Sequence, residues 1–148
     1  MNDYRVSKEQ VPNRLYYVHH ARSQANTTDG IKAQDPTFFH AHNHALYSYK
    51  ESVEDHMNWT CRKPSPYISL LVNKEHAENF ARLMSRKTGI PSQVFHINGK
   101  KLNTSYVFEV RHLRKALCLS LRPSALTDSE FLVLHRVPEK AIIRKIVM

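Results

Sequence analysis

The chain has 148 residues, and its 22 Lys and Arg against 13 Asp and Glu give a formal net charge of +9 at pH 7. This length suits one domain with its own hydrophobic core, and no apolar run approaches the roughly 20 residues that a membrane-spanning helix needs. The positive charge favours anionic partners such as phosphates, nucleic acid or acidic protein faces, but does not identify one of them.

The first residues and the cysteines bear on compartment. Residues 1–13 lack the apolar segment of a signal peptide, and we expect a polar arm there, followed by a single domain over residues 14–148. Cys61 and Cys118 match neither a disulfide framework nor a zinc spacing. We therefore expect a soluble protein with free thiols in a reducing intracellular compartment, and an unreactive, buried Cys118 within its apolar surroundings.

The first half of the chain predicts strands and helices in alternation. Residues 15–19, LYYVH, are rich in aromatic and β-branched side chains and predict a strand. Residues 28–34 suggest a short helix that Pro36 ends, and residues 49–59 suggest a longer one. Residues 67–72 form a continuous apolar run bounded by prolines, which predicts a buried strand.

The second half begins with the clearest element, a helix over residues 73–89. Asn73 suits the N-cap, Ala77 and Ala81 recur at helical spacing, and Gly89 suits the stop. Further predicted elements are a strand at 93–97, a helix at 107–119, and strands at 130–135 and 141–147. Because the strands do not alternate regularly with helices, the pattern favours an α+β domain.

An acidic pair stands at the start of the strand predicted for residues 130–135. Asp128 and Glu130 are two positions apart, so on extended backbone both side chains point to the same face. The pair can therefore look into one cleft. A carboxylate held where positive charge develops lowers a reaction barrier by preorganised electrostatics, so the spacing suggests a site.

Three segments, in order, resemble the ADP-ribosyltransferase family. They are residues 14–34 (RLYYVHHARSQANTTDGIKAQ), 65–70 (SPYISL) and 127–143 (TDSEFLVLHRVPEKAII), and they are most similar to the enterotoxin A-subunit branch and related uncharacterised fungal domains. The resemblance implies a split β-sandwich of two small sheets with flanking helices.

The resemblance also implies a function. It implies a mono-ADP-ribosyltransferase that uses NAD as its substrate and transfers ADP-ribose to a macromolecular acceptor, a protein or a nucleic acid, as a toxin or effector delivered into a host cell would do. Glu130 matches the catalytic glutamate, Ser69 the strand serine that steadies it, and Asp128 the acidic residue that faces the acceptor. Residues 122–129 match the substrate-recognition loop.

One departure concerns NAD binding. Tyr17 stands where the enterotoxin branch has an arginine that binds NAD. His19 follows on the same strand face, while Arg14 precedes the strand and Arg22 follows it, so each is a candidate for the missing group. We assign NAD binding to Tyr17, His19, Arg14 and Ser69.

Other interpretations remain open. The lost arginine favours a catalytically degenerate member of the same fold that binds a macromolecule through its basic surface. A basic nucleic-acid-binding domain without NAD chemistry is a third hypothesis, and it predicts steeply salt-dependent binding. His40, His42 and His44 invite a metal site, but no Cys or carboxylate accompanies them at ligand spacing, so we expect a surface loop and no metal. We expect His56 to pack in the core.

Overall fold

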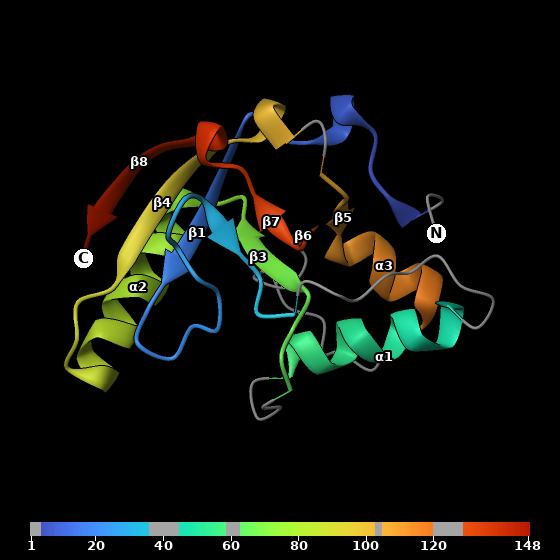
Figure 1. The fold of residues 1–148 in the computed structure, drawn as a ribbon, viewed down its shortest axis with the longest axis horizontal. Coiled ribbons are helices and arrows are strands. Elements are labelled where there is room, and N and C mark those ends of the chain that lie inside the picture. The colour runs from blue at the N-terminus through green and yellow to red at the C-terminus, as the bar shows by residue number, and fades with distance from the viewer. Residues whose placement is uncertain (1–3, 36–44, 59–62, 103–104, 120–128) are drawn as a thin grey trace.

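The structure, a computed structural model, describes residues 4–35, 45–58, 63–102, 105–119 and 129–148 (Figure 1). Within these ranges the helices are α1 (Ala45–Met57), α2 (Lys74–Thr88) and α3 (Val110–Leu117). The strands are β1 (Arg14–His19), β2 (Ile31–Lys32), β3 (Tyr67–Leu71), β4 (Gln93–Asn98), β5 (Val107–Glu109), β6 (Glu130–Leu134), β7 (Arg136–Val137) and β8 (Ile142–Val147).

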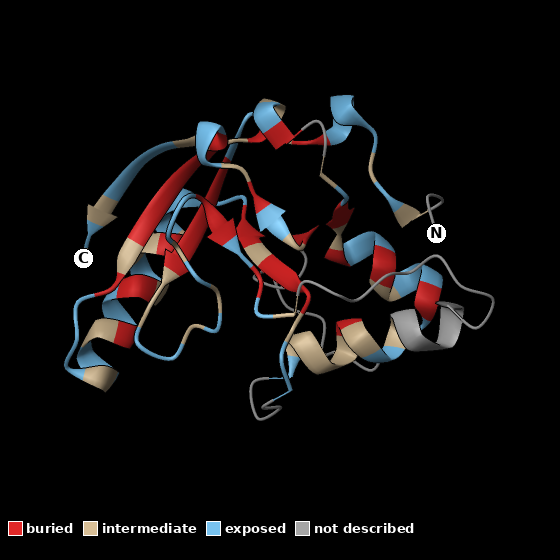
Figure 2. Cartoon of the chain, in the orientation of Figure 1, coloured by how far each residue is buried: buried red, intermediate tan, exposed pale blue. Residues whose placement is uncertain are grey.

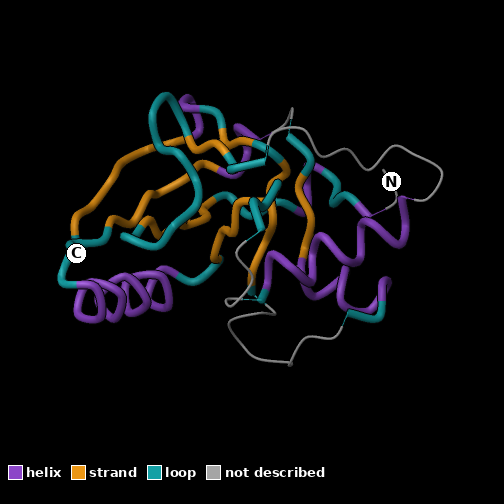
Figure 3. The backbone as a smooth tube through the Cα atoms, turned by 60° about the horizontal axis from the view of Figure 1, so that its bottom comes forward, coloured by secondary structure: helices purple, strands orange, loops and turns teal. Residues whose placement is uncertain are grey.

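The strands form two antiparallel sheets. Six of them pair in the order β5-β6-β3-β1-β4-β8, and β2 pairs with β7 in a second, two-stranded sheet. Ile31 of β2 and Val137 of β7 belong to the same buried cluster as Ile68 and Phe95 of the larger sheet, so the small sheet covers one of its faces. The helices gather on the other side in the turned view of Figure 3. The predicted α+β fold, with two small sheets and flanking helices, is confirmed.

The helices bury separate apolar clusters against the sheet. Ala77 and Ala81 of α2 pack on Tyr16 and Val18 of β1. Val53 of α1 and a row of α3 side chains pack instead on β3, β5 and β6. The sheet interior is accordingly buried, whereas β8 at its edge is largely exposed (Figure 2).

The larger sheet splits between its two central strands. β1 pairs with β4 over six residues but with β3 at Tyr16 and Leu71 alone. Beyond that pair the two strands carry no further ladder, and so they separate as β1 continues to His19. This gap divides the sheet into a β5-β6-β3 half and a β1-β4-β8 half.

Helix α2 follows the local signals in its sequence. The Asn73 side chain accepts a hydrogen bond from the His76 amide at 3.0 Å, and Gly89 ends the helix in the left-handed conformation with φ of 70°. The Gly89 amide donates to the Ser85 carbonyl at 2.9 Å. Both ends are thus satisfied by residues next to the helix, which is why the sequence predicts it well.

Two predicted elements are wrong in part. Residues 28–34 form no helix, because Asp29 and Gly30 take positive φ values and turn the chain into β2, which pairs with β7. Residues 107–119 divide into β5 and α3. Cys118 ends α3 in the left-handed conformation and is exposed, so the expectation of a buried thiol is also wrong.

The N-terminal arm packs against the domain. The Val6 amide donates to the Val107 carbonyl at 2.9 Å, beside the edge strand β5, and Val11 is buried in the core. Among the helices of the described ranges, none combines the length and the apolar character needed to cross a bilayer.

Candidate functional site

A cavity of about 470 Å³ opens where β1 and β3 separate. Its volume lies within the range of small-molecule sites. Tyr17 and Val18 of β1 line one side, and Ile68 and Ser69 of β3 line the other. Residues of α1, of α2 and of the segment after β1 complete the wall, among them His56, Phe80, Met84, Lys87, His20, Arg22, Ser23 and Gln24.

Glu130 is the buried carboxylate of the cavity. It is the first residue of β6, lies opposite Leu71 of β3, and is only 8% exposed. Ser69 lies two residues from Leu71 on the same face and is hydrogen-bonded to the Glu130 side chain. Burial raises the pKa of Glu130 to about 7, and the bond from Ser69 opposes that rise. The carboxyl group is therefore poised between its two protonation states near neutral pH.

His56 of α1 holds Ser69 from behind. Its Nε2 lies 2.7 Å from the Ser69 Oγ, and its Nδ1 lies 2.5 Å from the Ser65 Oγ. The ring also packs edge-on against Tyr67, with centroids 5.6 Å apart. Protein atoms enclose most of the ring although part of it faces the cavity, and this desolvation lowers the pKa of His56 to about 4, so the imidazole is neutral at pH 7.

The hydrogen bonds that link Ser65, His56, Ser69 and Glu130 all donate in one direction, towards Glu130. The Ser65 Oγ already accepts from the Tyr67 amide at 3.1 Å, so its hydroxyl proton is free to donate to the His56 Nδ1. A neutral imidazole that accepts at Nδ1 donates at Nε2, here to the Ser69 Oγ. The Ser69 hydroxyl then donates to ionised Glu130, which can only accept. The hydrogen bonds from Ser65 and His56 thus leave the Ser69 hydroxyl proton directed at the Glu130 carboxylate.

The side chains predicted to bind NAD do not all reach the cavity. Tyr17 lines it, but its hydroxyl lies 3.1 Å from the His19 Nδ1 and is also hydrogen-bonded to Ser23. Its ring packs in the core cluster against Phe95, and burial raises its pKa to about 12, so the phenol stays protonated. His19 and Arg14 are absent from the cavity wall.

Other cations stand at the cavity instead. Arg22, after β1, and Lys87, in the last turn of α2, line it and are exposed. Lys87 follows Phe80 and Met84 on one helix face, and Phe80 packs edge-on against His20 at 5.6 Å. Neither Arg22 nor Lys87 forms an ion pair within the described ranges. The cavity wall thus contains two cations without a carboxylate partner among the described residues.

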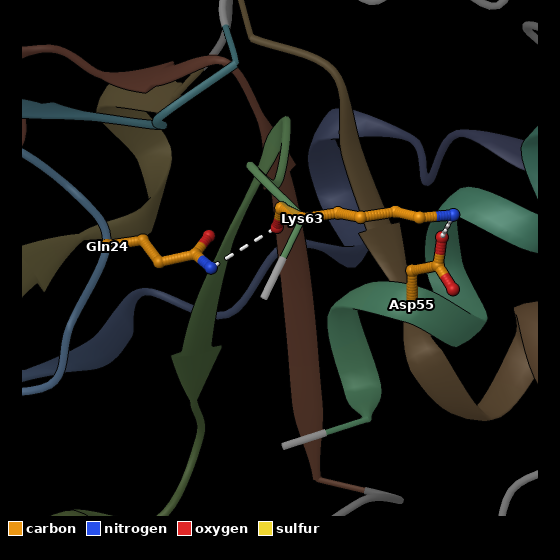
Figure 4. Close-up of polar contacts among 3 residues, drawn as sticks. All are labelled: Gln24, Asp55 and Lys63. Carbon is orange, nitrogen blue, oxygen red and sulfur yellow. Dashed lines mark hydrogen bonds and ion pairs between the residues drawn. The ribbon is translucent and has the colours of Figure 1, made fainter. Parts of the chain in front are cut away.

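Gln24 ties the two halves of the cavity wall together. Its side-chain amide donates to the Lys63 carbonyl at 3.2 Å and accepts from the Ser65 amide at 3.1 Å. Lys63 in turn pairs with Asp55 of α1 at 3.6 Å, as Figure 4 shows. The segment after β1 is therefore fastened to the segment that carries Ser65 and to the helix that carries His56.

Several predicted site residues lie outside the described ranges. These are Asp128 with most of the loop at 122–129, and His40, His42 and His44. Within the part of the chain that the structure does describe, no three His, Cys, Asp or Glu side chains converge as metal ligands. Of the three residues predicted to be catalytic, Ser69 and Glu130 lie in the described ranges, and the fold brings these two together.

His56 is the site residue that the sequence analysis missed. Core packing was expected, and its contact with Tyr67 fits that expectation. Its hydrogen bonds to two serines do not follow from any local pattern, because α1 and β3 meet only in the folded chain. Ser65 and Ser69, spaced four apart in SPYISL, were the available signal, since both have hydroxyl groups that need partners when buried.

Comparisons with known proteins agree with this architecture. A family model described as "Domain of unknown function (DUF7587)" matches residues 10–148. The solved structure of EcPltA, a PltA-type ADP-ribosyltransferase toxin subunit, superposes with a TM-score of 0.56 at 12% identity, over 91% of this chain and 75% of that one. No curated protein sequence matches the chain. The fold is thus ADP-ribosyltransferase-like.

Proposed function

The chain belongs to the DUF7587 domain family and has an ADP-ribosyltransferase-like fold, and on that premise we propose that it is a mono-ADP-ribosyltransferase. In the proposed reaction the bond between the nicotinamide nitrogen and the ribose of NAD breaks, and nicotinamide leaves with the electron pair. A nucleophilic atom of a macromolecular acceptor, protein or nucleic acid, then bonds to the ribose carbon and loses its proton. A toxin or effector role is compatible with this chemistry.

The series of hydrogen bonds from Ser65 through His56 and Ser69 to the buried Glu130 is the observation that carries the proposal. A cation develops on the ribose as nicotinamide leaves, and a carboxylate held beside it stabilises that charge. Ser69, itself fixed by His56, orients the Glu130 carboxylate and favours its ionised form. A solvated strand-edge glutamate would need no such support. Asp128 remains our candidate for the residue that faces the acceptor.

The cavity suggests how NAD is held without a first-strand arginine. We assign the ribose end to Ser69 and Glu130, and Tyr17 to the wall between the sheet halves. The diphosphate would lie against Arg22 and Lys87, the cations that line the cavity without a carboxylate partner in the described ranges. His19 would act on NAD only through Tyr17, and Arg14 would have to approach from outside the cavity wall.

One observation favours a second candidate, a degenerate domain that only binds a macromolecule. The Tyr17 hydroxyl, at the position of the family's arginine, is already bonded to His19 and Ser23 and so offers NAD no free donor. If Arg22 and Lys87 do not replace that arginine, affinity for NAD is low. This candidate predicts a folded protein with no nicotinamide release.

The deciding experiment measures nicotinamide release from NAD, with a cell lysate as the source of acceptor. Glu130→Gln keeps the volume of the side chain and removes its charge, and Glu139→Gln makes the same change at an exposed position outside the cavity. We expect release by the wild type and by Glu139→Gln, and its loss in Glu130→Gln. Release that persists in Glu130→Gln refutes the mechanism, and no release from any folded form selects the binding domain.

A further inference from the structure

A second group of cations lies on the α2 face of the large sheet, outside the cavity wall. Tyr16, His96 and Arg144 stand directly opposite one another on β1, β4 and β8, so their side chains share one face. Arg14 precedes Tyr16 by two residues and points the same way. Lys74 opens α2, which crosses this face. The cavity is lined by neither His96 nor any of these cations.

His96 is the unusual member of this group. The residue is only 8% exposed, and its ring packs edge-on against Tyr16 with centroids 5.1 Å apart. Its Nε2 is closed to solvent and has no hydrogen-bond partner within the described part of the chain. Buried ring nitrogens normally have one, so the His96 Nε2 has an unused capacity to bond a ligand.

The charges around His96 are mostly of one sign. Burial is the largest cause that lowers its pKa, and Arg144, Lys74 and Arg14 lower it further, while Glu78 of α2 alone acts in the opposite direction. These three cations are exposed and form no ion pair in the described ranges. A ligand reaches the buried His96 Nε2 only when neighbouring side chains move aside.

We propose that Arg14, Lys74, His96 and Arg144 form an anion site that binds a phosphoryl group. The His96 Nε2 would donate from the sheet below, the two guanidinium groups from β1 and β8, and the ammonium from α2. A tetrahedral phosphoryl group has oxygens to meet donors from all of these directions, whereas a planar carboxylate does not. The site is distinct from the cavity, because the two share no lining residue.

The test follows the His96 ring by ¹⁵N NMR while inorganic phosphate is added to the full chain at constant ionic strength, with NaCl as the counterpart. Ionic strength must match because salt alone screens the three cations and raises the pKa of His96. We expect saturable shifts with phosphate, a higher His96 pKa when phosphate is bound, and affinity roughly tenfold weaker in Arg144→Gln. Arg111→Gln, an exposed cation of α3, is the matched control and should bind phosphate normally.

His96→Gln assigns the resonance, and if it does not fold, the exposed Arg144→Gln and Lys74→Gln variants still decide the question. Shifts that NaCl reproduces, or an affinity unchanged in both variants, overturn the proposal. A short oligonucleotide with and without a 5′ phosphate distinguishes the source of the group. Tighter binding of the phosphorylated strand than of free phosphate, lost in Arg144→Gln, supports a nucleic-acid phosphate, and equal affinity supports free phosphate.

Discussion

At the scale of single residues, the buried titratable groups of the site lower the stability of the folded protein. Glu130 is buried beside hydroxyl groups but has no cationic partner among the described side chains, so its ionisation is opposed by desolvation. Burial also disfavours the charged form of His56, which is the protonated one, and so lowers its pKa where it raises that of Glu130. Groups with strongly shifted pKa values cluster at functional sites, and here two of them are joined through Ser69.

We predict that Glu130→Gln stabilises the protein at high pH while it abolishes turnover. Burial raises the pKa of Glu130 from its ordinary value of 4.5 to about 7, so between these pH values only the unfolded chain releases the proton and stability falls. Above pH 7 the full penalty, roughly 3 kcal/mol, is present in the wild type and absent from the variant. Urea unfolding at pH 8 measures the difference.

The same measurement at lower pH reports on His56 and on other wholly or partly buried histidines. The pKa of His56 falls from 6.5 to about 4 on folding, so stability is lost as pH drops from 6.5 towards 4. In the wild type this slope opposes that of Glu130. In Glu130→Gln the opposing slope is gone, and His56 shares the remaining loss of stability with His19, His20 and His96, whose pKa values burial also lowers. A variant no more stable than wild type at pH 8 contradicts the burial of a charged Glu130.

At the scale of elements, α1 positions the site through one turn of helix. Val53 anchors the helix in the apolar cluster beneath the sheet, Ser52 bonds the Tyr67 hydroxyl at 2.7 Å, and His56 follows one turn later at Ser69. The helix therefore sets the rotation of the imidazole. Gln24 fastens the opposite wall to the same segment of chain.

We predict that His56→Leu lowers kcat/KM for NAD roughly 100-fold, because Ser69 is no longer held in position. Leu keeps the space filled and dry, so the loss is not one of packing volume. With its hydrogen bond from Ser69 weakened, Glu130 should also titrate above its wild-type midpoint of about 7 in the pH profile of kcat/KM. His112→Leu, at an exposed position of α3, should change neither quantity. An unshifted profile in His56→Leu would mean that the ring only packs.

Two glycines provide a matched test of the β2–β7 sheet. A Cβ at Gly30 would lie 2.6 Å from the Val137 carbonyl oxygen, and its φ of 104° suits no other residue well. A Cβ at Gly89 meets nothing within 4 Å, although its φ is 70°. We predict a loss of about 1 kcal/mol of unfolding free energy for Gly89→Ala and at least twice that for Gly30→Ala. Equal losses in thermal unfolding would show that backbone conformation alone decides both.

At the scale of the whole molecule, the split in the large sheet opens the cavity, and charged side chains lie both in the cavity wall and outside it. The cavity wall holds the buried carboxyl group of Glu130 as well as the exposed Arg22 and Lys87. Another group of cations lies on the α2 face. The excess of positive charge is thus partly gathered into two groups of cations rather than spread evenly.

We predict that Arg22→Gln with Lys87→Gln raises the KM for NAD roughly tenfold and leaves kcat nearly unchanged, since both contacts would be present in the ground state as well as the transition state. The control is Arg111→Gln with Lys115→Gln, an equal loss of charge on exposed α3. Steady-state kinetics measure both. A KM that rises equally in the control would assign the effect to overall charge.

The sequence by itself determined the features that depend on neighbouring residues or on a resemblance. The caps of α2, the strand ending at Asn98 and the pairing of Ser69 with Glu130 could be read in this way. The α+β class also followed, because the order of apolar runs constrains which layers can form.

Only the tertiary structure decided what depends on distant partners. Residues 31–32 become a strand because β7 lies beside them, and His56 joins the site because α1 crosses β3. Arg22, not Arg14, lines the cavity because the sheet splits beyond Tyr16, which places the two ends of β1 in different surroundings. Hydrogen bonds and charge interactions between distant segments do not depend on the secondary-structure propensity of either segment. No local pattern in the sequence therefore predicts them, and they form only when the segments pack together.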